Sequence, residues 1–265
     1  MTLSSLSIQL LNGLAGASSL FLRAAGLSLI FDITRIVNSA HGSLYMLGLY
    51  IAYSATEYFG NSFLRFWGGV LVSALAVAVI GALVEMLLLR RIYRAPELFQ
   101  LLATFALVLV IKDAALYIWG AEELLGSRAP GLTGSVELLG QRFPQYNLLL
   151  MCIGPVVLGL LWLLLTRTRW GSLIRAATQD REMVGALGVN QAWLFTSVFA
   201  LGAFLAGLGG ALQLPNEPAS LNLDLQVIGD AFVVVVGGMG SIPGAYLAAL
   251  LIAVTKAICA GIGTV

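Results

Sequence analysis

Charged side chains are scarce in this sequence. Only 10% of the 265 residues are Asp, Glu, Lys or Arg, whereas 59% are hydrophobic and the mean hydropathy is +0.94. Soluble domains are about one quarter charged and about half apolar, and a soluble fold could not bury this much apolar surface. The net charge of +1 gives no indication of nucleic acid binding. The composition predicts an integral protein of the lipid bilayer.

Histidine and cysteine are almost absent. His41 is the single histidine, so no histidine-based metal cluster and no Ser-His-Asp triad of the usual kind is available. Cys152 and Cys259 lie inside apolar runs without metal-ligand spacing, and we expect them to be packing residues. The acids are isolated, which disfavours an intramembrane enzyme. A GxxxxGK[ST] phosphate-binding loop is also missing, so we expect no bound cofactor and no ATP hydrolysis by this chain.

The chain also lacks linkers. Hydrophobic segments recur from end to end without a charged or Pro/Ser-rich stretch between them, which predicts a single transmembrane domain over residues 1–265. The 30 glycines fit helices that pack closely in a membrane. No Lys or Arg precedes the first apolar stretch, so we expect it to remain as a helix rather than be cleaved as a signal peptide.

Apolar runs of the length needed to cross a bilayer, about 20 residues, recur along the chain. The expected fold is all-α, a polytopic transmembrane bundle of about eight elements, some of them discontinuous or re-entrant. The glycine-rich stretch 237–244 divides the last run into two elements and is either unwound backbone lining a cavity or a tight turn at a close helix crossing. The expected runs are Ile8–Phe31, Ser43–Phe59, Phe66–Leu89, Leu98–Trp119, Leu148–Leu165, Ala192–Leu214 and Leu225–Val265.

Arginine clusters predict the orientation. Arg90, Arg91 and Arg94 follow the third run, and four arginines at 167, 169, 175 and 181 follow the fifth. Because Lys and Arg concentrate in short cytoplasmic loops, both regions should face the cytoplasm. Loops 120–147 and 215–229, and the N-terminus, should then lie outside.

Several charged residues fall inside the expected helices. Arg23 lies about 12 Å from the end of its helix. It is either a pathway residue that meets a substrate carboxylate, or a structural residue that pairs with an acid such as Asp32 or Asp113 or snorkels to the headgroups. Lys112 and Asp113 are adjacent and so point about 100° apart. One should reach outward while the other faces the bundle.

Two further polar residues have local interpretations. Glu85 is one turn or so from Arg90 and Arg91, which predicts a local salt bridge near the inner interface. His41 precedes a helix start and should satisfy backbone at that helix end, with a proton-relay role as the alternative.

The stretch from Trp170 to Leu214 predicts a short amphipathic cytoplasmic helix joined to a helix rich in small residues. Met183, Val184 and Leu187 fall at helical spacing and should share one side, beside Arg181 and Glu182. This side suits either the groove of a soluble partner or the lipid headgroup surface.

Four blocks of the chain, in order, resemble the branched-chain amino acid ABC permeases of the LivH type. The first is GLSLIFDITRIVNSAHGSLYMLGLY from Gly26, the second combines Glu85 with the arginines and Thr104-Phe105, the third is the cytoplasmic stretch, and the fourth is the GGMGS run from Gly237. The chain departs from the family at Arg23 and Asp32. It also stops inside an apolar run, which on this resemblance implies a truncation or a missing last helix.

The resemblance implies a permease subunit of a bacterial inner-membrane ABC importer, carrying branched-chain amino acids or a related small polar solute. Its implied partners are a second permease subunit, two ABC ATPase subunits that use ATP, and an extracytoplasmic binding protein. A self-sufficient secondary transporter or channel is the alternative. The implied ATPase-coupling residues are Arg175, Arg181, Glu182, Met183, Val184, Leu187, Gly188 and Asn190, and the candidate pathway residues are Arg23, Asn38, His41, Thr104, Gly237, Gly238 and Gly240.

Overall fold

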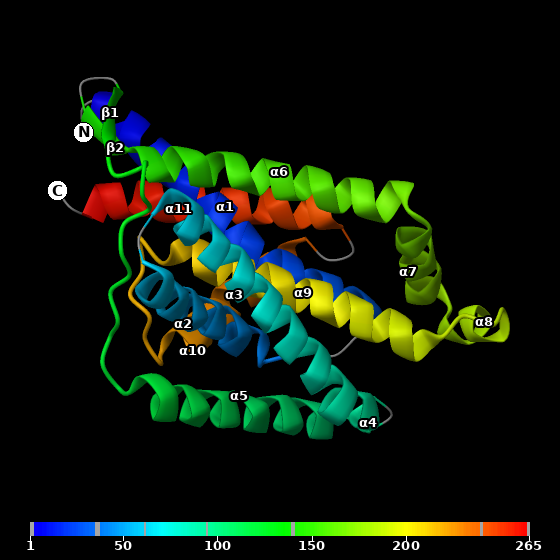
Figure 1. Cartoon of the computed structure of the whole chain (residues 1–265). Coiled ribbons are helices and arrows are strands. Elements are labelled where there is room, and N and C mark those ends of the chain that lie inside the picture. The colour runs from blue at the N-terminus through cyan, green and yellow to red at the C-terminus, as the bar shows by residue number, and fades with distance from the viewer. Residues whose placement is uncertain are drawn as a thin grey trace.

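The computed structural model describes residues 3–34, 38–60, 62–93, 95–138, 141–238 and 241–263 (Figure 1). Within them, the chain folds into a bundle of long helices with one small hairpin. The elements are α1 (Leu3–Thr34), α2 (His41–Phe59), α3 (Phe63–Val84), a π-helical turn (Glu85–Leu89), α4 (Arg90–Ile92), α5 (Glu97–Trp119), β1 (Ser135–Leu138), β2 (Gln141–Pro144), α6 (Gln145–Arg167), α7 (Arg169–Gln179), α8 (Arg181–Ala186), α9 (Gln191–Gln213), α10 (Leu223–Gly237) and α11 (Ile242–Gly263).

Six helical spans among the described residues are long and apolar enough to cross a membrane. They correspond to six of the runs expected from the sequence, and α2 and α10 supply the other elements. The last apolar run is divided into α10 and α11, as expected. The expected all-α class and polytopic architecture are confirmed, with one small hairpin in addition. The spans are 9–34, 63–92, 97–119, 145–167, 191–213 and 242–260.

Helix α10 is the discontinuous element of the bundle. It has 15 residues, which at 1.5 Å per residue reach about 22 Å and cannot cross a hydrocarbon layer of about 30 Å. The chain leaves α9, turns back, and enters α10 beside α2 (Figure 1). Polar residues of the α9–α10 connection are thereby brought against α1.

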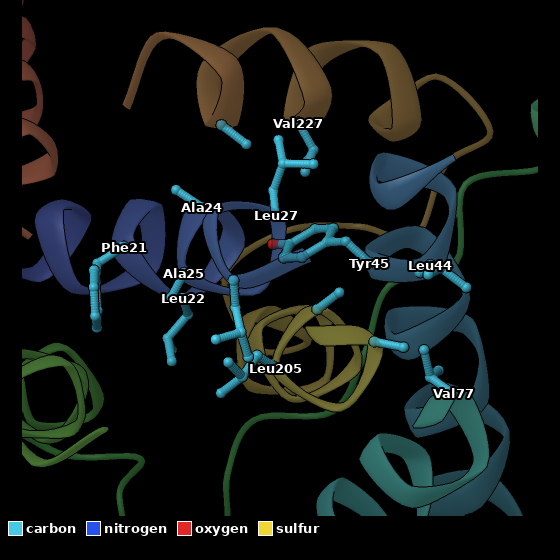
Figure 2. Packing of buried hydrophobic residues seen from close by; sticks show 14 of the residues in the cluster. Phe21, Leu22, Ala24, Ala25, Leu27, Leu44, Tyr45, Val77, Leu205 and Val227 are labelled. Atoms are coloured by element: carbon cyan, nitrogen blue, oxygen red, sulfur yellow. The ribbon is translucent and has the colours of Figure 1, made fainter. Parts of the chain in front are cut away.

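Helices α1, α2 and α9 form the centre of the bundle, and α10 packs against α1 and α2 (Figure 2). Tyr45 of α2 is fully buried, and its ring is surrounded by these helices. Small residues allow their backbones to meet. A Cβ on Gly210 of α9 would lie 2.1 Å from the Tyr45 carbonyl oxygen, and one on Gly48 of α2 would lie 2.5 Å from the carbonyl oxygen of Gly207. Only glycine fits at these crossings.

A short antiparallel hairpin lies in the region that the sequence interpretation treated as an irregular outer loop. Strands β1 and β2 place Glu137 opposite Arg142, and opposite charges across a strand pair stabilise it. Phe143 of β2 is buried. The strands have only four residues each, too few for an alternating pattern to be recognised in the sequence.

Helices α3, α5, α6 and α11 surround the centre and carry many exposed apolar side chains. Such faces are expected where lipid or another subunit covers a membrane protein. Cys152 of α6 and Cys259 of α11 are exposed on this surface, so the expectation that they pack in the interior of this chain is wrong. An apolar neighbourhood in the sequence cannot separate a lipid-facing residue from a core residue.

Candidate functional site

Arg23 in the middle of α1 pairs with Glu217, which follows α9. The Nη2 atom of Arg23 is 2.7 Å from Oε1 and 2.9 Å from Oε2 of Glu217, and the arginine side chain is only 8% exposed. A paired interpretation of Arg23 is therefore correct, but the expected partners, Asp32 and Asp113, are not the acids used. Asp32 is nine residues further along the same helix, about 13 Å away along its axis, and Asp113 lies on an exposed face of α5.

Tyr45 completes this charged centre. Its hydroxyl donates to Oε2 of Glu217 at 3.0 Å, and the guanidinium of Arg23 lies 4.7 Å from the centroid of its ring. The cation therefore contacts both a carboxylate and an aromatic face, which together offset the loss of water around it. Sequence reasoning did not identify Tyr45 or Glu217. Two features of the sequence could have indicated the pair. A buried Arg23 requires an acid, and Glu217 lies in a connection that is too long for a simple turn.

A polar cavity of about 350 Å³ opens beside Arg23 and Glu217. A second ion pair borders it, since Nζ of Lys256 in α11 is 2.7 Å from Oδ1 of Asp230 in α10. Gln213 donates a hydrogen bond to Ser19 across the same cavity. Two cations, two carboxylates and several amides thus face a space large enough for a small solute carrying both charges. The remaining lining residues are Asn12, Ala15, Gly16, Leu20, Asn147, Leu150, Asn216 and Ala253.

His41 and Asn38 lie behind the charged centre rather than in the cavity. His41 is fully buried, and its Nε2 lies 2.9 Å from the carbonyl oxygen of Arg23. It therefore bonds the middle of α1, not the end of its own helix as expected. Asn38 accepts from the Ala40 amide at 3.1 Å and orders the turn before α2. A Cβ on Gly26 would lie 2.9 Å from the His41 ring, so that glycine makes room for the histidine.

The other candidate pathway residues fall elsewhere. Thr104 is buried and donates to the Leu101 carbonyl oxygen of its own helix at 3.0 Å. Gly238 accepts from the Ser241 amide at 3.0 Å, and a Cβ there would lie 2.2 Å from the Ala245 nitrogen. The structure thus favours a tight turn and close helix approach at Gly237 and Gly238. Gly240 lies outside the described residues. Of the pathway candidates that the structure describes, Arg23 is the one that lines the cavity.

The cytoplasmic stretch of the sequence interpretation forms α7, α8 and the start of α9, each begun by a capping side chain. Thr168 accepts from the Gly171 amide, Asp180 from the Met183 amide, and Asn190 from the Trp193 amide, at 3.0, 2.9 and 3.1 Å. Each bond satisfies an amide that a helix start would leave open. Gly188 follows α8 with φ of +83°, a conformation that favours glycine after a helix.

The surface of α8 differs from the expected one. Met183 and Leu187 are 58% and 76% exposed, four residues apart on one side, whereas Val184 is only 4% exposed. Neighbouring helical positions point about 100° apart, so Val184 turns inward and fixes α8 to the bundle. Glu182 and Arg175 are also exposed. The surface offered to a partner is therefore Met183 and Leu187, with polar residues around them.

Arg181 anchors α8 rather than extending from it. It donates to the carbonyl oxygen of Ile33 near the end of α1, and its guanidinium lies 5.2 Å from the ring centroid of Phe195 in α9. Gln191 at the start of α9 donates to the Arg181 carbonyl oxygen at 2.6 Å. A force on α8 therefore reaches both α1, which carries Arg23, and α9, which leads to Glu217.

Glu85 forms a third polar centre, at the π-helical turn where α3 meets α9. Its side chain is fully buried and accepts from Thr196 at 2.5 Å, Tyr93 at 3.0 Å and Arg90 at 3.3 Å. The expected local pair with Arg90 is confirmed, and the bond to Thr196 extends it to α9. Burial and the adjacent Glu85 carboxylate raise the pKa of Tyr93, which keeps its hydroxyl protonated as a donor.

A bundle of apolar spans around a charged cavity, with a short helical pair projecting at one end, defines the class of multi-pass membrane transport proteins. Over residues 9–264 the sequence matches the family described as branched-chain amino acid transport system, permease component, and the chain belongs to that family.

Two of the relatives match nearly the whole chain. It is 28% identical to the high-affinity branched-chain amino acid transport system permease protein BraD of Pseudomonas aeruginosa over 94% of this chain and 84% of that one. It is 25% identical to the corresponding LivH protein of Salmonella typhimurium over the same shares. A fructose import permease protein, FrcC of Rhizobium meliloti, is 26% identical over 53% of this chain and 42% of its own. No solved structure gives a significant match.

Proposed function

We propose that this chain is the permease subunit of an ABC importer and that, with a second permease subunit, it forms the path for branched-chain amino acids or a related small polar solute. The observation that carries this proposal is the match of 94% of the chain to a permease of a branched-chain amino acid transport system. The organisation of the bundle, with a solute-sized charged cavity and a projecting coupling element, supports it.

The charged cavity suits a solute with one positive and one negative group. Arg23 and Lys256 can receive a carboxylate, and Glu217 and Asp230 can receive an ammonium group. Each of these ions is already balanced by a neighbour within the chain, so the cavity carries no isolated charge inside the membrane. When the solute enters, its carboxylate and ammonium groups would replace these internal partners. The solute would therefore bind weakly and could be released.

The exposed side of α8 is the proposed contact with an ABC ATPase subunit. Met183 and Leu187 form a small apolar surface on a helix that is capped at its start and anchored by Arg181 and Val184. A rigid helix with two exposed apolar anchors suits a groove in a soluble partner. Binding of ATP by two such subunits would move α8, and α1 and α9 with it. The path would thereby open alternately to the two sides.

The proposed setting is the bacterial inner membrane, with α7 and α8 in the cytoplasm. Exposed arginines at 90, 91, 167, 169 and 175 gather at the ends of the spans on this side. The N-terminus and the β1–β2 hairpin then lie outside, where an extracytoplasmic binding protein would deliver the solute.

Reconstitution tests the proposed function directly. The chain would be placed in proteoliposomes with its second permease subunit, ATPase subunits and binding protein, and uptake of labelled leucine would be followed. Uptake that requires ATP and all partners is the expected result. Transport by the chain alone along a solute or ion gradient would show a self-sufficient transporter instead.

A further inference from the structure

Asp113 occupies an unusual place on α5. The buried residues of this helix, Thr104, Val108, Ile111 and Ala115, form one stripe that packs on the bundle. At 100° per residue, Asp113 points almost directly away from that stripe. It is exposed, and among the described residues it has no hydrogen-bond or ion-pair partner. The preceding Lys112 faces inward instead, with Nζ 3.8 Å from Oδ1 of buried Asp224 in α10.

Asp113 is well inside the apolar part of its helix. It precedes Trp119, the last residue of α5, by six residues, or about 9 Å along the axis. A short carboxylate side chain cannot reach the headgroups over that distance as a lysine can. The residues around it on the same face, including Leu109 and Leu116, are exposed and apolar.

Other exposed charges in the described parts of the six spans have an explanation. Those of Arg65, Arg90, Arg91, Glu97 and Arg167 lie within the first or last turn of a span, and Lys256 is paired with Asp230. The outward faces of α3 and α6 carry apolar side chains between their ends. A face that contacts lipid does not usually contain a carboxylate, because an unpaired carboxylate in hydrocarbon is costly. The α5 face that carries Asp113 is therefore not expected to contact lipid in the assembled protein.

We propose that the α5 face around Asp113 packs against the second permease subunit of the assembled transporter, which shields the carboxylate from lipid and gives it a hydrogen-bond donor or a cation. The inference rests on the proposed function, because that function supplies the second subunit. Tyr117, one turn beyond Asp113 and 91% exposed, extends the same contact. Within this chain α5 packs chiefly on α2, so the opposite side remains available.

Photo-crosslinking in the intact transporter tests this interface. The photoreactive residue p-benzoylphenylalanine would replace Leu109, one turn from Asp113 and 50% exposed, or as a matched control Leu160 of α6, which is 60% exposed. Illumination in membranes should join Leu109→p-benzoylphenylalanine to a permease subunit, identified by mass, while the Leu160 variant gives lipid adducts. Absence of a protein product at position 109, or a product with a protein other than a permease, would overturn the proposal.

A second measurement uses Asp113 itself. Asp113→Leu favours lipid, so membrane insertion of the chain is not at risk. It should reduce recovery of the second permease subunit by about tenfold, equivalent to about 1.4 kcal/mol, whereas Asp113→Asn, which retains an acceptor, should reduce recovery less than Asp113→Leu. Unchanged recovery with Asp113→Leu would contradict the interface. ATP-dependent uptake is measured on the same samples, so an active transporter without the α5 contact refutes this inference alone.

Discussion

A single terminal nitrogen of Arg23 bridges both carboxylate oxygens of Glu217, although the two residues are 194 positions apart in the chain. The contact exists because the connection after α9 folds back against α1 before α10 begins. It holds a long arginine side chain in place and closes one wall of the cavity. The pair therefore joins the middle of the first helix to the discontinuous part of the bundle.

Removing one member of this pair should cost more than removing both. Arg23→Leu leaves Glu217 without its cation and should lower the free energy of unfolding by about 2 kcal/mol, since Glu217 is partly exposed and water compensates in part. The double variant Arg23→Leu/Glu217→Gln should recover most of that loss. Thermal unfolding in detergent measures both, and equal losses in the single and double variants would show that Glu217 without its cation is not destabilising.

Transport separates the structural role of the pair from a role in the path. If Arg23 receives the solute carboxylate, the stable double variant should still lose ATP-dependent uptake, by about tenfold or more. Full uptake by the double variant would assign the pair to folding alone. Tyr45→Phe serves as a milder comparison, because it removes one hydrogen bond to Glu217 and leaves the ring beneath Arg23.

Alanine at the central glycines should be damaging, and alanine at peripheral glycines should not. Gly210→Ala places a methyl group 2.1 Å from a backbone oxygen of α2, and neither backbone can move without separating α9 from α2. We expect a loss of at least about 3 kcal/mol, seen as low yield of folded protein in detergent. Gly159→Ala on α6, where nothing lies within 4 Å, is the matched control. Similar yields for the two variants would contradict the close packing of α2 and α9.

Glu85 should be needed for the junction between α3 and α9. Glu85→Leu removes the acceptor of Thr196, Tyr93 and Arg90 at once, and the freed donors should lower stability by about 2 to 3 kcal/mol. Tyr93→Phe removes only one of these bonds and should cost about 1 kcal/mol. Thermal unfolding of the two variants measures the difference. A stability of Glu85→Leu equal to that of Tyr93→Phe would show that the bonds to Thr196 and Arg90 are dispensable.

The elements of this fold were largely predictable from the sequence because lipid imposes a strong rule on helix length and composition. The contacts between helices were not. Arg23 required an acidic partner. A single sequence cannot show that the folded chain brings Glu217, rather than Asp32, next to Arg23. Similarly, Val184 points inward because of the way α8 packs against the bundle. In a helix of only six residues, the spacing of the apolar residues does not decide which face is buried.

The orientation can be tested with single cysteines. After Cys152 and Cys259 are replaced, Ser172→Cys on α7 and Thr133→Cys before the hairpin, both exposed, report opposite ends of the bundle. An impermeant thiol reagent added outside intact cells should label position 133 and spare position 172. The reverse pattern would invert the topology and with it the cytoplasmic placement of α8.

Helix α8 provides the sharpest test of coupling, because its neighbouring residues Met183 and Val184 differ in burial, the first exposed and the second buried. Met183→Asp or Leu187→Asp would bury a carboxylate in the proposed ATPase contact. A loss of about 3 kcal/mol there weakens association by about a hundredfold. Insertion and thermal stability should be unchanged, because both side chains are exposed in this chain. Val184→Asp should instead destabilise the permease itself, since that side chain is 4% exposed.

The matched control for these variants is Ala186→Ser, an exposed change on the same helix. ATPase subunits should co-purify with the parent and with Ala186→Ser and be lost from Met183→Asp and Leu187→Asp, together with solute-stimulated ATP hydrolysis. If both aspartate variants retain the ATPase at parental levels, α8 is not the coupling element. The arginine-rich end of the bundle would then have to contact the ATPase through α7 or α4, whose exposed residues include Arg175, Arg90 and Arg91.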